Sequence, residues 1–258
     1  MMTFGIRVYG LGAVALGLVG LAWGDFALQW QPVPDGVPGR TVLAYATGAA
    51  LMLAGAVLFW RRTTAFGAAA LTALYAAGVV LLHGPRVAAH PLALAEWSGA
   101  AEQLVLVAGG LIAYASWGKI DPALAARLSR LARLGFGACL LVFGAAHFLY
   151  LEFTAAMVPK WIPPGQMFWA CATGAAHIAA GLAILSGVQA RLAAMLITAM
   201  FAGFSILLHI PNLLADPASH LNWVINAINL ALTGAAWVVA DSLASETEPV
   251  AVPVLRAI

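Results

Sequence analysis

Two histidines and a glutamate lie inside or beside long apolar stretches in the second half of the chain. His147 and His177 each end the tetrapeptide Gly-Ala-Ala-His, and Glu152 closes the stretch that contains His147. A charge-capable side chain in hydrocarbon costs several kcal/mol, so such a residue marks a functional site by default. Imidazole and carboxylate groups accept and release protons, so we expect this cluster to bind a polar group or to carry protons.

Further polar residues lie at depths that match this pair. His209 is near the outer end of a later apolar run, and three asparagines at spacing i, i+4, i+7 share one helical face of the last run. We expect these side chains to form a polar pocket that opens to the outside, with Trp161, Phe168 and Trp169 lining its mouth. The residues predicted to bind the ligand are His147, Glu152, Trp161, His177, His209, Asn222, Asn226 and Asn229.

Structural roles remain open for several of these residues. In the repeated motif Leu-Leu-His-x-Pro the histidine can cap a helix C-terminus, the interpretation that we favour for His83. An asparagine ladder serves equally well to bond neighbouring helices, and the Gly-Ala pairs read best as packing surfaces. His147 and His177 can also be buried without a function. No metal site is predicted, and Cys139 and Cys171 lie at depths too different for a disulfide.

The composition indicates that these residues lie on transmembrane helices. The chain has 258 residues, of which 63% are apolar and 9% charged, whereas a soluble domain carries about a quarter charged residues. Long apolar runs between short polar loops indicate an all-α polytopic membrane protein. No basic stripe suggests a nucleic-acid partner. The eight transmembrane spans are predicted at Val8–Gly24, Val42–Trp60, Ala65–Leu82, Gly99–Trp117, Leu134–Leu151, Met167–Gly187, Leu192–Leu208 and Leu221–Ala240.

The chain repeats itself at an interval of 126 residues. Pro38–Ser116 aligns with Pro164–Ser242 without a gap, and 25 of these 79 positions are identical. Arg7–Phe26 matches Arg133–Phe153 with one extra residue in the second copy. An even number of spans returns the chain to its starting side of the membrane. The sequence therefore predicts two tandem four-helix bundles in the same orientation.

The first copy is expected to be degenerate, and if the site needs both intramembrane histidines, only the second copy can hold it. Trp23 stands near the place of His147, and Leu51 replaces His177. Asp121 and Pro122 are suited to begin a helix between the copies. The predicted domains are a first repeat over residues 1–120, a basic amphipathic linker on the inner leaflet over 121–133, a second repeat over 134–242, and a disordered cytoplasmic tail over 243–258.

The distribution of Lys and Arg predicts how the protein lies in the membrane. Nine of these residues fall in loops on one side and three on the other, which places both termini in the cytoplasm. The predicted cytoplasmic residues are Arg7, Arg61, Arg62, Lys119, Arg127, Arg130, Arg133, Arg191 and Arg256, and the external ones are Arg40, Arg86 and Lys160.

Several motifs of the second copy occur together in one known family. They are Arg133-x-x-x-Gly137, Val158-Pro-x-Trp-Ile-Pro163, Thr173-Gly-x-x-His177-x-x-x-Gly181-Leu and Arg191-Leu-Ala-Ala. On these residues the chain resembles the DoxX-like family of four-span membrane proteins. That family takes its name from the membrane subunit of thiosulfate:quinone oxidoreductase. The resemblance implies a bacterial inner-membrane protein associated with a redox partner subunit.

We therefore expect the second bundle to bind a quinone or a similar lipid-soluble molecule. In this hypothesis His147 and His177 donate a hydrogen bond to a quinone carbonyl and carry its proton, while Glu152 and His209 lead to the outer water. Haem b held by two of the three histidines is chemically possible in a four-helix bundle, but it ranks lower because nothing in the sequence fixes the ring planes or depths. A small-molecule transporter or a non-catalytic membrane scaffold is the alternative from a different class.

Overall fold

The structure, a computed structural model, describes residues 4–244, and within that range it consists of helices and the turns between them. Eight helices are long and apolar enough to cross a membrane. They are Phe4–Trp23, Arg40–Phe59, Thr64–Ala89, Leu94–Trp117, Pro122–Leu149, Gln166–Ser186, Ala190–Ala215 and His220–Ala244. Each contains most or all of one predicted span, so the all-α fold with eight apolar spans is confirmed for the described residues. These helices fit a multi-pass membrane protein.

Shorter elements break or connect these eight helices. The α-helices are α1 (Phe4–Trp23), α2 (Arg40–Ala56), α3 (Thr64–Gly78), α4 (Gly84–Ala89), α5 (Leu94–Trp117), α6 (Pro122–Leu149), α7 (Leu151–Met157), α8 (Gln166–Ser186), α9 (Ala190–Phe204), α10 (Ile210–Ala215) and α11 (His220–Ala244). Leu28–Trp30 (η1) and Val57–Phe59 (η2) are 3₁₀ turns, and Val79–His83 (η3) and Ser205–His209 (η4) are π-helical.

The two π-helical segments correct the predicted ends of two spans. His83 and His209 were expected to begin loops, but each ends a π-helix that continues directly into α4 or α10. The proline two residues later lacks an N–H and crowds the preceding turn, which favours a change of hydrogen-bond register there. Both histidines therefore lie within a continuous helical rod and can face its neighbours.

The helices pack as one closed ring. Around the ring the helices follow in the order α1, α2, α3, α5, α6, α8, α9 and α11, and α11 closes the ring by packing on α1. Helices α5 and α11 also pack on each other across the middle of the ring. The first helix of each half packs along the last helix of the other half: α1 along α11, and α6 along α5. The two halves therefore share extensive contacts along both of these helix pairs.

Small residues permit the packing between the halves. A Cβ atom added at Gly12 would lie 2.4 Å from the Cα of Ala231, and one added at Gly234 would lie 2.1 Å from the backbone nitrogen of Tyr9. Close backbone approach of this kind stabilises helix pairs in lipid, where van der Waals packing replaces the hydrophobic effect. The outward faces carry exposed apolar side chains, among them Leu11, Leu18, Leu53, Phe66, Val80 and Leu196.

The predicted linker is not a separate element. Residues 122–133 form the first three turns of α6, which continues without a break to Leu149. Asp121 caps this helix as expected, with its carboxylate accepting a hydrogen bond from the backbone N–H of Leu124 at 3.0 Å. Leu243 and Ala244, placed in the predicted tail, belong to α11. The remaining tail residues, 245–258, lie outside the described residues.

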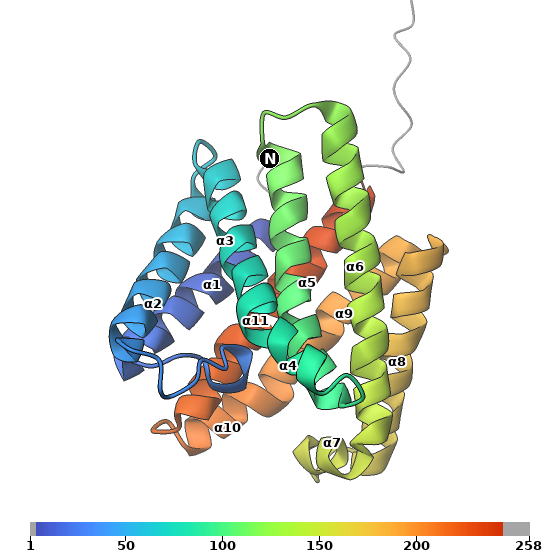
Figure 1. Ribbon diagram of the computed structural model, residues 1–258. Coiled ribbons are helices and arrows are strands. Elements are labelled where there is room, and N and C mark those ends of the chain that lie inside the picture. The colour runs from blue at the N-terminus through green and yellow to red at the C-terminus, as the bar shows by residue number, and fades with distance from the viewer. Residues whose placement is uncertain (1–3, 245–258) are drawn as a thin grey trace, which may run out of the picture.

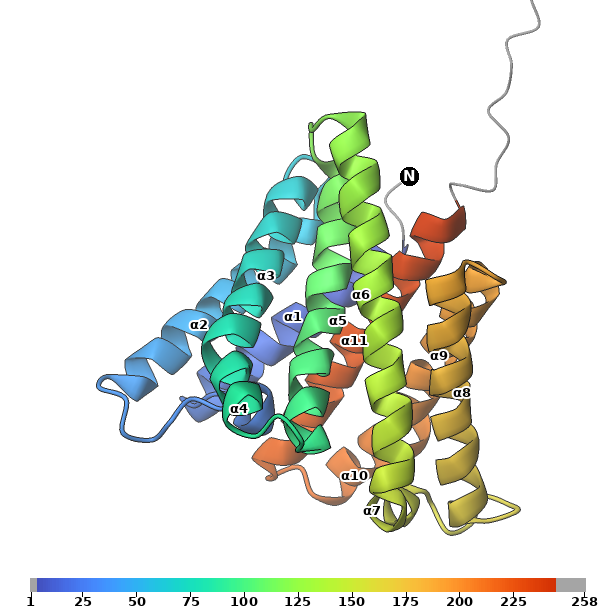
Figure 2. The same cartoon turned by 45° about the vertical axis from the view of Figure 1, so that its right-hand side comes forward.

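The two ends of the described chain lie at the same end of the helices (Figures 1 and 2). The short helices α4, α7 and α10 lie at the opposite end, which we call the short-helix end. The candidate site described next opens between α4, α7 and η4 and the ends of α5, α6, α8 and α11.

Candidate functional site

A close crossing of α6 and α8 brings the two Gly-Ala-Ala-His sequences together. A Cβ atom added at Gly144 would lie 2.9 Å from the carbonyl oxygen of Gly174, and one added at Gly174 would lie 2.8 Å from the Cβ of His147. With only hydrogen at these positions, the helices approach closely enough for the histidines to meet. The ring centres of His147 and His177 are 4.8 Å apart, with the ring planes at 44°.

Both imidazole rings are held in one tautomer by their own helix. The Nδ1 atom of His147 lies 2.8 Å from the carbonyl oxygen of Phe143, and that of His177 lies 2.8 Å from the carbonyl oxygen of Thr173. A carbonyl oxygen only accepts hydrogen bonds, so the proton of each neutral ring is on Nδ1. Nε2 is then an acceptor in both rings. In this tautomer each neutral ring presents an acceptor, and not a donor, to a ligand.

These rings line a cavity of about 660 Å³ at the short-helix end. His177 is buried among aromatic rings, with ring centres 5.8 Å from Phe143, 5.8 Å from Phe201 and 6.5 Å from Phe204. Small-molecule sites commonly occupy about 300–1,000 Å³ and combine apolar walls with a few convergent polar groups. This cavity fits that description.

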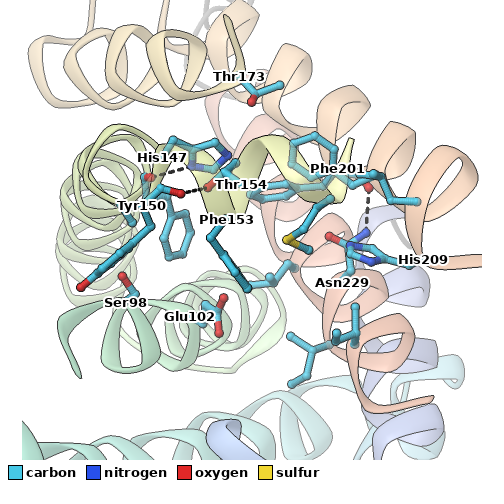
Figure 3. A pocket seen from close by; sticks show the side chains of 18 of the residues that line it. Ser98, Glu102, His147, Tyr150, Phe153, Thr154, Thr173, Phe201, His209 and Asn229 are labelled. Atoms are coloured by element: carbon cyan, nitrogen blue, oxygen red, sulfur yellow. Dashed lines mark hydrogen bonds between the residues drawn. The ribbon is translucent and has the colours of Figure 1, made fainter. Parts of the chain in front are cut away.

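The structure places half of the predicted site residues on the cavity. His147, His177, His209 and Asn229 line it, and Figure 3 shows His147 on one side and His209 beside Asn229 on another. Glu152, Trp161, Asn222 and Asn226 do not line it. Trp169 lines its mouth as expected, whereas Phe168 does not.

Glu152 and Trp161 are displaced from the cavity by a break in the chain after α6. The helix ends at Leu149 and α7 begins at Leu151, so the direction of the chain changes before Glu152. Glu152 is exposed in the first turn of α7. Trp161 is 72% exposed and borders a smaller hollow between the 158–161 loop and η4. α7 instead presents Phe153, Thr154 and Met157 to the cavity.

The asparagine ladder mainly bonds α11 to neighbouring segments. The side-chain amide of Asn222 donates to the carbonyl oxygens of Asn212 and Asp216, and that of Asn226 donates to the carbonyl oxygen of His209 at 2.9 Å. These bonds satisfy the carbonyls around α10 and at the end of η4, where the helical pattern changes. The packing interpretation therefore applies to Asn222 and Asn226, and only Asn229 reaches the cavity.

The first half of the chain also lines the cavity. Glu102 and Ser98 extend into it from α5, opposite His147 (Figure 3). At the mouth, Arg86 of α4 and Glu96 of α5 form an ion pair with N–O distances of 2.7 and 3.0 Å. Both halves therefore line the cavity, because the ring packs α5 directly on α6.

Glu102 was missed from the sequence although its signal was present. It is the one acidic residue within the predicted span Gly99–Trp117, and the rule that marked His147 applies to it equally. The repeat alignment did not draw attention to Glu102, because the corresponding residue of the second copy is the apolar Ile228.

His83 has a different role from the predicted helix cap. It is 2% exposed, and its Nε2 lies 3.2 Å from the carbonyl oxygen of Trp30, which also accepts a hydrogen bond from Gln103 at 2.8 Å. Trp30, itself 6% exposed, fills space in the first half. His83 thus anchors the η1 turn at the edge of the cavity.

The histidine pair does not suit a shared haem iron. Two imidazoles on opposite faces of one iron need ring centres about 6 Å apart, since each ligating nitrogen lies ~2 Å from the metal. The separation of 4.8 Å between His147 and His177 is shorter. Among the described residues, no group of three or more His, Cys, Asp or Glu side chains is arranged to hold a metal ion.

Comparison with known proteins concerns the second half of the chain. Residues 136–240 match a family described as a domain of unknown function (DUF8561). This stretch includes His147, His177 and Asn229 but not Glu102. No curated protein and no solved structure matches the chain. The chemistry of the cavity is therefore the basis for assigning a function.

Proposed function

We propose that this protein binds a lipid-soluble ring compound of the quinone class in the cavity between its two halves. The observation that carries the proposal is the pair of imidazole rings, 4.8 Å apart, on the wall of an otherwise largely aromatic and aliphatic cavity of about 660 Å³. A quinone combines a flat apolar ring with two oxygen substituents, so it needs this combination of walls and few polar groups.

The DoxX-like motifs support a place beside a redox system. They fall on the elements that build the site: Gly137 and Gly181 lie where α6 crosses α8, and the backbone carbonyl oxygen of Thr173 accepts a hydrogen bond from Nδ1 of His177. In this proposal the protein is a redox-associated membrane subunit, and a separate partner subunit exchanges electrons with the bound quinone.

Purification in mild detergent, followed by solvent extraction and chromatography, tests the proposal. We expect a quinone to be recovered in near-equimolar amount with the protein, and a visible spectrum without a haem Soret band. Protein that carries no quinone, and that binds no added decyl-benzoquinone or decyl-benzoquinol in a fluorescence titration, would exclude the proposed function.

We also propose that the two halves are copies of one four-span unit in the same orientation. Equivalent glycines support this: a Cβ at Gly10 would lie 2.9 Å from the carbonyl oxygen of Gly55, and one at Gly137 would lie 3.2 Å from that of Gly181. The first crossing joins α1 to α2 and the second joins α6 to α8. Both halves also carry a π-helix that ends in histidine at the same repeat position.

The proposed location is a bacterial inner membrane, with both termini in the cytoplasm and the cavity opening outward. Reporter fusions after Arg62 and Arg130 should therefore show cytoplasmic activity, and a fusion at Lys160 should show external activity, because basic loops are retained inside. The signal at Lys160 decides the matter, since a cytoplasmic Lys160 would reverse the topology and place the cavity on the inner side.

A further inference from the structure

Three side chains of the second half present hydrogen-bond acceptors to the cavity. Nε2 of His147 and of His177 are acceptors in the neutral rings. Asn229 uses its amide group to donate to the carbonyl oxygen of Phe201 at 2.8 Å and to Oγ of Ser205 at 2.7 Å. Both amide hydrogens are then committed, and its Oδ1 is the atom left for a ligand.

The hydroxyl groups on the cavity wall are committed to the backbone. Ser98 donates to the carbonyl oxygen of Leu94 at 3.0 Å, and Thr154 donates to that of Tyr150 at 3.1 Å. Thr173 does the same within α8 at 2.7 Å. The donors that remain on the wall are the Gln29 amide, the Arg86 N–H groups that do not bond Glu96, the Tyr150 hydroxyl, the His209 ring and the Trp30 indole.

As a carboxylate, Glu102 adds two more acceptor oxygens on the opposite side of the cavity. Figure 3 shows its carboxyl group pointing into the cavity from α5, across from His147. The indole of Trp30 lies beside this carboxyl group, but its N–H has no hydrogen bond of normal geometry. Within the described residues, no side chain or backbone group donates a hydrogen bond of that geometry to Glu102. Its carboxyl group, with the Trp30 indole beside it, faces the cavity and can reach a ligand.

We propose that the cavity selects the reduced form of its ligand, a quinol, and that Glu102 is the residue that recognises one of its two hydroxyl groups. The histidine pair accepts the hydrogen bond of the other hydroxyl group. An oxidised quinone has only carbonyl acceptors, which would face Glu102 and Nε2 without a proton between them. A site built around one hydrogen-bonding pattern discriminates strongly against an analogue that lacks it. This inference rests on the proposed function and names the redox form that it concerns.

Titration of the purified protein with decyl-benzoquinol and with decyl-benzoquinone, under argon and with tryptophan fluorescence as the readout, tests this selectivity. We expect the quinol to bind about ten-fold more tightly or better. Glu102→Gln keeps the shape of the side chain but adds an N–H donor. The ratio of the two dissociation constants should therefore fall to about one or invert in that variant. Because the ratio is measured within one sample, it does not depend on the folded fraction.

Glu152→Gln is the matched control, because Glu152 is an exposed glutamate away from the cavity. It should keep the ratio of the unaltered protein. Equal binding of both forms, tighter binding of the quinone, or a ratio that Glu102→Gln leaves unchanged would overturn this inference while the proposed quinone-class function stands. Failure of both compounds to bind would instead remove the proposed function itself.

Discussion

His147→Leu and His177→Leu should each lower the total amount of quinol and quinone that co-purifies with the protein by about ten-fold or more. Leucine fills a similar space and suits hydrocarbon, but it offers no acceptor to a ligand hydroxyl group. A buried polar group left without a partner costs about 1–3 kcal/mol, and each 1.4 kcal/mol is ten-fold in affinity. Extraction and chromatography of equal amounts of each purified variant measure the effect.

His90→Leu is the matched control for this experiment. His90 is an exposed histidine that follows α4 and does not line the cavity, so its removal should leave the bound quinone unchanged. Size-exclusion profiles of all three variants should match that of the unaltered protein. If both cavity variants retain full occupancy, the histidines serve packing alone and the ligand binds elsewhere.

Gly234→Ala should strongly destabilise the protein, although it adds only one methyl group. The new Cβ atom would lie 2.1 Å from the backbone nitrogen and 2.4 Å from the Cα of Tyr9. Backbone atoms cannot rotate away, so α1 and α11 must separate. We expect a loss of about 3 kcal/mol, at the upper end of ordinary overpacking, and a fall in apparent melting temperature of roughly 10 °C. Thermal unfolding in detergent measures this change.

Gly135→Ala provides a control of the opposite sign. Gly135 is exposed in the middle of α6, and an added Cβ atom would have nothing within 4 Å. Alanine is favoured over glycine inside a helix by about 0.5–1 kcal/mol, so this variant should be slightly stabilised. A Gly234→Ala protein as stable as the unaltered one would contradict the packing of α1 on α11 that closes the ring.

The sequence by itself determined the number of apolar helices and the depth of each residue along them. Hydropathy places the spans because a helix must expose apolar side chains to lipid along its whole length. Local signals also held: Asp121 caps α6, and the Gly-Ala-Ala-His sequences mark a close helix crossing. Each of these signals involves residues close together in the chain.

Only the tertiary structure decided which helices are neighbours and which way each polar side chain faces. A helix that is apolar all round carries little information about its partners, because lipid and protein are similar surroundings for leucine. The sequence therefore did not predict that α5 packs on α6, or that Glu102 shares a cavity with His147. A one-residue change in where a helix ends turns the next side chain by about 100°. Because α6 ends before Glu152, that residue faces away from the cavity although it is only five residues beyond His147. Glu102 is far away in the chain, but it lines the cavity because α5 packs on α6.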